Sequence, residues 1–102
     1  MAKGYWIVRA DITNPEAYKK YVEANAEPLA RHGARFLVRG GQADLREGEA
    51  RARNVVVEFP SVEAARACYD DAGYRRAIGF REGAATFDLI VIEGYDGPQP
   101  GA

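Results

Sequence analysis

The sequence has one cysteine, almost no net charge and no long hydrophobic run. Cys68 alone cannot form an internal disulfide, which is typical of a protein from a reducing compartment. The formal net charge of -1 argues against a nucleic-acid partner, because an excess of Lys and Arg holds such partners. Neither a secretory signal nor an apolar stretch of the roughly 20 residues that cross a bilayer is visible. We therefore expect a cytoplasmic protein with no nucleic-acid and no membrane partner.

Motifs for metals, phosphates and serine nucleophiles are absent as well. His32 is the only histidine, and no second His or Cys lies at the spacing of metal ligands. The pair Gly40-Gly41 lacks the Lys-Ser/Thr and the helix that complete a phosphate-binding loop. No nucleophile elbow built around a serine is present. The sequence thus predicts no metal and no cofactor.

What the sequence does contain predicts one α+β domain. Apolar alternation and β-branched residues indicate strands at residues 4–12, 34–38, 54–59 and 86–93, with pairing resuming over 43–45. Helical spacing and caps indicate helices at residues 15–32, 62–71 and, as a short piece after a break at Gly73, 74–80. Asn14 and Ser61 are the expected N-caps, and Pro28 should kink the first helix or split off its last turn. We expect the domain to span residues 1–95 and residues 96–102 to form a flexible tail.

This order of elements predicts a ferredoxin-like β-α-β-β-α-β sandwich, in which a four-stranded antiparallel sheet carries two helices on one face. The strands, however, are apolar on both faces: Phe87 and Leu89 alternate with Ile90 and Ile92. Leaving even four such side chains in water would forgo roughly 6–12 kcal/mol, at roughly 1.5–3 kcal/mol each. We therefore expect a second copy to cover the open face, giving a homodimer that packs or closes as an α/β barrel.

Several segments resemble a known family. They are residues 1–7, 15–18, 36–41, 57–61 and 92–94. The most specific are Arg39-Gly40-Gly41 and Glu58-Phe59-Pro60-Ser61. Together they are similar to the small bacterial domain-of-unknown-function family DUF1330, over nearly the whole chain except its tail. The resemblance implies the dimeric α/β-barrel superfamily, which contains cofactor-independent monooxygenases, isomerases, haem-dependent members and ligand-sensing domains, and it does not choose among them.

Two candidate catalytic residues stand out, His32 and Glu58. His32 lies near a helix C-terminus and could act as a base, or it could simply pack there. Arg39 and Glu58 lie on strands that we expect to be neighbours, and a charge within a sheet is costly unless it is paired or meets a ligand. Arg39 could grip a substrate carboxylate with Glu58 as orienting group or base, or the two could form a structural ion pair.

Further candidates for ligand binding are Asn25, Tyr74 and Arg81. Asn25 lies on the apolar face of the first predicted helix and needs a hydrogen-bond partner if it is buried. Tyr74 and Arg81 follow Gly73 in an irregular segment of the kind that often lines pockets, and the family pattern has a tyrosine and an arginine here. The aromatic residues are interpreted as core and interface side chains rather than as a cofactor site. They include Trp6, Tyr18, Tyr21 and Tyr69.

Three functions stay open at this point. The first is a dimeric domain that binds a small, acidic or aromatic molecule between helices and sheet, with Asn25, His32, Arg39, Tyr74 and Arg81 around it. The second is a cofactor-independent monooxygenase or isomerase that uses His32 or Glu58 as its base. The third is a structural dimer without a ligand.

Overall fold

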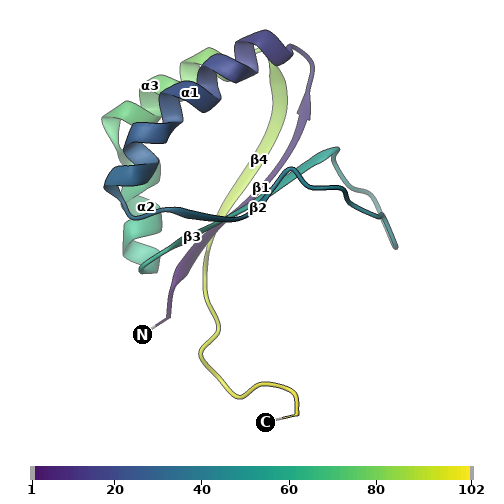
Figure 1. Cartoon of the computed structure of the whole chain (residues 1–102), viewed down its shortest axis with the longest axis vertical. Helices are drawn as coiled ribbons and strands as arrows, with labels where there is room; N and C mark the ends of the chain where they lie inside the picture. The colour runs from purple at the N-terminus through teal and green to yellow at the C-terminus, as the bar shows by residue number, and fades with distance from the viewer. Residues whose placement is uncertain (1, 102) are drawn as a thin grey trace.

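Four strands form one antiparallel sheet (Figure 1). Their order across the sheet is β2-β3-β1-β4. The strands are β1 (Gly4–Ile12), β2 (Arg35–Arg39), β3 (Arg53–Phe59) and β4 (Ala85–Glu93). The structure, a computed structural model, describes residues 2–101. The predicted ferredoxin-like α+β fold with an antiparallel four-stranded sheet is confirmed.

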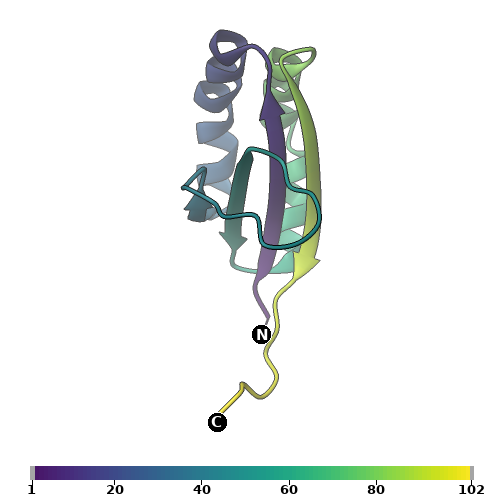
Figure 2. The same ribbon diagram turned by 90° about the vertical axis from the view of Figure 1, so that its right-hand side faces the viewer.

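Three helices cover one face of the sheet, the two of the predicted sandwich and the short piece expected after Gly73 (Figure 2). They are α1 (Pro15–Arg31), α2 (Val62–Asp70) and α3 (Ala72–Arg81). The second and third helices are separated at Asp71, which has an extended backbone and accepts a bond from the N–H of Gly73 at 2.7 Å. The break therefore lies two residues before the glycine at which the sequence predicts it. Within residues 2–101 no helix is long and apolar enough to span a membrane.

Side-chain caps begin α1 and α2 where the sequence places them. The Asn14 side chain accepts a hydrogen bond from the N–H of Ala17, and Ser61 does the same for Ala64. No turn splits off at Pro28, because α1 runs on as one helix to Arg31. Pro28 is buried, and its carbonyl lies 3.7 Å from the Cys68 sulfur, so packing against α2 holds the last turn in place.

The core lies between the helices and the sheet. Side chains of one parity on β1 and β3 point toward the helices and are buried: Trp6, Val8, Val55, Val57 and Phe59. The indole N–H of Trp6 donates to the carbonyl of Ala65 at 2.9 Å, which fixes β1 against α2.

The other face of the sheet has no covering layer in a single chain (Figure 2). Ile7 at its centre lies opposite Val56 on one side and Ile90 on the other. Ile90 and Ile92 are about half exposed, at 54% and 47%. The open face thus carries apolar side chains, as the alternation in the sequence predicts.

A long loop, residues 40–52, projects from the sheet between β2 and β3 (Figure 1). The expected pairing over residues 43–45 is wrong, because this stretch forms no strand. Gly40 begins the loop with a φ of +71°, a conformation that favours glycine. The loop returns at Arg51 and Ala52, which both donate to the carboxylate of Asp11 at 2.9 Å. Residues 94–101 leave β4 without further helix or strand, and the flexibility expected for the tail stays a prediction.

Candidate functional site

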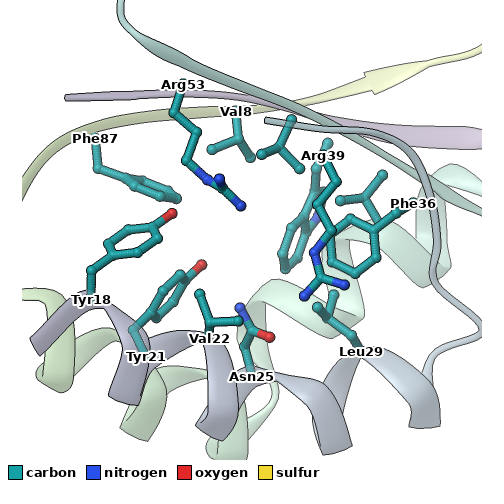
Figure 3. A pocket seen from close by; sticks show the side chains of 13 residues that line it. Val8, Tyr18, Tyr21, Val22, Asn25, Leu29, Phe36, Arg39, Arg53 and Phe87 are labelled. Atoms are coloured by element: carbon teal, nitrogen blue, oxygen red, sulfur yellow. The ribbon is translucent and has the colours of Figure 1, made fainter. Parts of the chain in front are cut away.

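A cavity lies between α1 and the helix-covered face of the sheet (Figure 3). It contains about 380 Å³ of empty space, counting the part that opens to solvent. The space that a water-sized molecule can occupy is about 30 Å³. Small-molecule sites have roughly 300–1,000 Å³, so a ring-shaped ligand would enter only if the lining side chains move apart. Most of the wall is apolar or aromatic, and it consists of Trp6, Val8, Tyr18, Tyr21, Val22, Leu29, Phe36, Val55, Val57 and Phe87.

Asn25 supplies a buried amide to the cavity. It lies on α1, one turn after Tyr21, and only 7% of its surface is exposed. Its Oδ1 atom has no hydrogen-bond partner among residues 2–101. A buried acceptor without a partner costs about 1–3 kcal/mol. The cavity is thus built with one polar group that a bound molecule could satisfy.

Two arginines bring positive charge to the same space. Arg53, at the start of β3, has a buried Nε atom that lacks a hydrogen-bond partner within residues 2–101. Its guanidinium lies 5.9 Å from the centre of the Tyr18 ring and points toward the cavity (Figure 3). Arg39, at the end of β2, lies with its guanidinium carbon 4.0 Å from the centre of the Phe36 ring. No Asp or Glu of the described chain lines the cavity, so these charges meet no counter-charge there.

Gly40 leaves room for one of these arginines. A Cβ atom at this position would collide with the guanidinium of Arg53. The glycine that starts the loop therefore also permits the placement of Arg53 beside the cavity.

A pair of tyrosines and a third arginine lie at the inner wall. The hydroxyl of Tyr21, which lines the cavity, is 2.7 Å from that of Tyr74. Tyr74 is fully buried, and this burial raises the pKa of its hydroxyl well above the usual range. The guanidinium carbon of Arg81 lies 3.8 Å from the Phe87 ring centre and 5.1 Å from that of Tyr21. The pKa of Arg81 is raised: burial lowers it, and the interactions with the hydroxyls of Tyr74 and Tyr21 outweigh that effect.

The structure brings together only some of the predicted site residues. Asn25 and Arg39 line the cavity, while Tyr74 and Arg81 lie behind its wall. His32 lies elsewhere, with Nε2 2.9 Å from the Asp71 carboxylate, and it does not line the cavity. Among residues 2–101, no group of three His, Cys, Asp or Glu side chains could hold a metal ion.

Glu58 lies on the open face of the sheet, away from Arg39. It accepts a hydrogen bond from the Tyr5 hydroxyl at 3.2 Å and is paired with Arg35 in the strand register. The expected approach of Arg39 and Glu58 is wrong. An irregularity between Phe36 and Val38 shifts the register of β2, so that Arg39 comes opposite Val55 on the helix-covered face. One extra residue in a strand moves every later side chain to the other face.

The sequence interpretation missed Arg53. The signal was present: Arg53 has the same strand parity as Val55 and Val57, which places a charge on the buried face of β3. Tyr18, Tyr21 and Trp6 were expected in the core, and they do lie there, but they line the cavity as well.

Residues 3–95 match the family model described as a domain of unknown function, DUF1330. The chain belongs to this family. The predicted resemblance is confirmed over almost the whole sequence. A comparison with curated proteins found no match.

Solved structures with the same fold include three informative ones. A protein of unknown function from Rhodopseudomonas palustris, RPA0582, has a TM-score of 0.75 at 21% identity, covering 94% of this chain and 85% of that one. SnoaB, a cofactor-independent oxygenase from Streptomyces nogalater, has a TM-score of 0.61 at 14% identity, covering 98% and 99%. A putative antibiotic biosynthesis monooxygenase from Nitrosomonas europaea has a TM-score of 0.59 at 18% identity, covering 92% and 91%. At these identities the likeness establishes the fold alone.

Proposed function

We propose that this DUF1330 protein binds a small ring-containing anion, such as an aromatic carboxylate, in the cavity between α1 and the sheet. The observation that carries the proposal is the convergence of Asn25, Arg39 and Arg53 on an apolar space that no carboxylate of the described chain lines. Arginine binds carboxylates through two parallel hydrogen bonds, so Arg39 and Arg53 suit the acid group of such a ligand. The aromatic walls suit a flat ring, because aromatic rings pack well against each other.

Arg53 supports the proposal most directly. A charged group that is partly buried without a counter-charge destabilises the fold unless a ligand or water compensates it. Arg53 has its nearest aromatic partner in Tyr18 and an Nε atom without a bond. A carboxylate bound beside it would supply both the missing acceptor and the missing charge.

Benzoate and benzamide provide the test, since they have nearly the same shape and differ in charge. Isothermal titration calorimetry on the wild-type protein should show that benzoate binds more tightly. Trp6, the only tryptophan, lines the cavity and gives a second readout through its fluorescence. In Arg53→Met we expect benzoate to bind roughly tenfold or more weakly, because a hydrogen bond to a charged group contributes about 1.5–3 kcal/mol.

Arg66→Met is the matched control, because Arg66 is an exposed arginine on α2 that does not line the cavity. It should bind benzoate as the wild type does. Equal binding of benzoate and benzamide, or an unchanged benzoate affinity in Arg53→Met, would refute the proposal of an anion site.

A second candidate function is a cofactor-independent enzyme. The pair of hydroxyls on Tyr21 and Tyr74 favours it, because Tyr21 places a hydroxyl at the cavity wall and the Tyr74 hydroxyl lies 2.7 Å behind it. The predicted catalytic roles of His32 and Glu58 gain no support from their positions outside the cavity. An enzyme on this scaffold would have to work without them.

We also propose that two copies associate through the open face of the sheet. Support comes from the apolar side chains that this face exposes around Ile7, above all Ile90 and Ile92. Covering them would recover free energy in proportion to the apolar area removed from water. A purely structural dimer, the third function predicted above, would apply if the dimer forms and no ring-containing anion binds.

A further inference from the structure

We infer that the cavity stabilises the ionised form of a bound phenol or enol, with Tyr21 donating a hydrogen bond to the ligand's oxyanion. The inference rests on the proposed function, because it assigns a second polar group to the same ligand. It narrows the ligand class to ring compounds that carry a weakly acidic hydroxyl as well as, or in place of, a carboxylate.

The direction of the hydrogen bonds at the inner wall supports a donor role for Tyr21. The Tyr21 and Tyr74 hydroxyls lie 2.7 Å apart, and either one could donate to the other. Arg81 has only donors, and its pKa is raised: burial lowers it, and the interactions with Tyr74 and Tyr21 outweigh that effect. Where Arg81 donates to the Tyr74 oxygen, the Tyr74 hydrogen turns toward Tyr21. The hydrogen of Tyr21 is then free to point into the cavity.

Tyr74 keeps its proton at neutral pH. Burial raises the pKa of Tyr74 above its usual range, so that hydroxyl does not compete with a ligand for the negative charge. Tyr74 is held in place on two sides, because its ring centre lies 4.9 Å from that of Trp6 and 5.6 Å from that of Tyr69. We therefore assign Tyr74 as a positioning residue that acts through Tyr21.

The charge around the cavity also favours the ionised form of a bound phenol. Arg39 and Arg53 line it, Arg81 lies directly behind Tyr21 and Phe87, and no Asp or Glu among residues 2–101 lies in the wall. Positive charges and hydrogen-bond donors lower the pKa of a weak acid that binds beside them. On binding, the O–H bond of the phenol breaks, its electron pair stays on the oxygen, and the proton passes to the buffer.

The probe for the test is 4-nitrophenol, whose neutral and ionised forms absorb at different wavelengths. The probe is titrated with acid and base in the presence of saturating wild-type protein and, separately, without protein. We expect the titration midpoint of the bound probe to fall by about one pH unit, which corresponds to about tenfold preference for the anion.

Two substitutions assign the shift to the hydroxyls. Tyr21→Phe should abolish most of it, and Tyr74→Phe should reduce it, since each removes one hydroxyl and keeps the ring. Arg81→Met gives a third variant, in which the donor behind the tyrosines is lost and the apolar stem is kept. Tyr95→Phe is the matched control, because Tyr95 is 68% exposed in the tail and should leave the midpoint unchanged.

The outcomes separate this inference from the proposed function. If the wild type binds benzoate but does not bind 4-nitrophenol, or binds it with an unshifted or raised midpoint, the inference is overturned and the anion site stands. The same holds if Tyr21→Phe retains the full shift, since the arginines alone would then produce it. If neither probe binds, the proposed function fails and the inference fails with it.

Discussion

The guanidinium of Arg31 donates two hydrogen bonds to the carboxylate of Asp71, from Nη2 to Oδ1 at 2.8 Å and from Nε to Oδ2 at 3.3 Å. The pair joins the last turn of α1 to the residue that separates α2 from α3. These bonds from Arg31, with further ones from His32 and the N–H of Gly73, hold the pKa of Asp71 well below its usual range. The packing of α1 against the junction of α2 and α3 therefore depends on Asp71 being ionised, and so on pH.

Asp71→Asn should lower stability at neutral pH and make it less sensitive to acid. The pKa of Asp71 is lower in the folded protein than in the unfolded chain, where it is about 3.9. The pairing thus stabilises the fold above that pH, and its contribution is lost as the pH falls from there toward the folded pKa. Urea unfolding midpoints at neutral pH and at about pH 3 measure the effect. The urea midpoint of the wild type should fall more between the neutral and the acidic pH than the midpoint of Asp71→Asn does.

Glu27→Gln is the control for this pair. Glu27 is the other acidic partner of Arg31, but its side chain is 84% exposed. Exposed ion pairs of this kind contribute little to stability. If Glu27→Gln changed the pH dependence of stability as Asp71→Asn does, the effect would come from Arg31 in general and not from its pairing with Asp71 between α2 and α3.

Gly40→Ala should weaken both the fold and the binding of benzoate. The positive φ of Gly40 costs a residue with a side chain about 1–2 kcal/mol, and its Cβ would displace the guanidinium of Arg53. Gly48→Ala is the matched control, since Gly48 has a φ of +74° and a Cβ atom added there would meet nothing within 4 Å. Chemical denaturation should show a similar loss in both variants, and calorimetry a loss of benzoate affinity in Gly40→Ala alone. Equal benzoate affinities in Gly40→Ala and Gly48→Ala would show that Gly40 does not contribute to the binding site.

The sequence predicted the fold because its local signals agree with the tertiary structure. Asn14 and Ser61 cap the helices they were expected to cap, and the apolar alternation marks the four strands within a residue or so. The helix break at Asp71 was misplaced, because Gly73 gives a stronger local signal than an aspartate that caps the next helix.

The site was harder to predict than the fold. Asn25 was identified because a polar residue on an apolar helix face needs a partner. The pairing of Arg39 with Glu58 failed because the register shift between Phe36 and Val38 depends on how β2 meets β3, which no local pattern encodes. His32 bonds to Asp71, a contact across 39 residues that local spacing does not reveal.

Cys68 should be unreactive in the native protein. Its side chain is fully buried and lies 3.7 Å from the carbonyl of Pro28, and burial raises the pKa of the Cys68 thiol to about 12. Since the thiolate is the reactive form, the disulfide reagent DTNB should modify native protein far more slowly than protein unfolded in urea. Rapid modification without denaturant would mean that α2 separates from α1 in the folded state. Cys68→Ser, which has no thiol, gives the background rate.

Ile90→Arg should convert a dimer into monomers. Multi-angle light scattering of the wild type at micromolar concentration should give about twice the chain mass of 11.2 kDa. Ile90 lies on the open face opposite Ile7 and is 54% exposed in a single chain, so an arginine there would place an unpaired charge inside the interface.

Phe80→Arg tests whether this effect belongs to the open face. Phe80 is 43% exposed but lies on α3, on the other side of the sheet, so the same change there should leave the dimer intact. Dissociation in both variants would place the interface elsewhere. A wild type that is monomeric in dilute solution would leave Ile7, Ile90 and Ile92 exposed to water without a partner. The proposed association through the sheet would then be rejected, while the cavity on the opposite face, formed within one chain, would be unaffected.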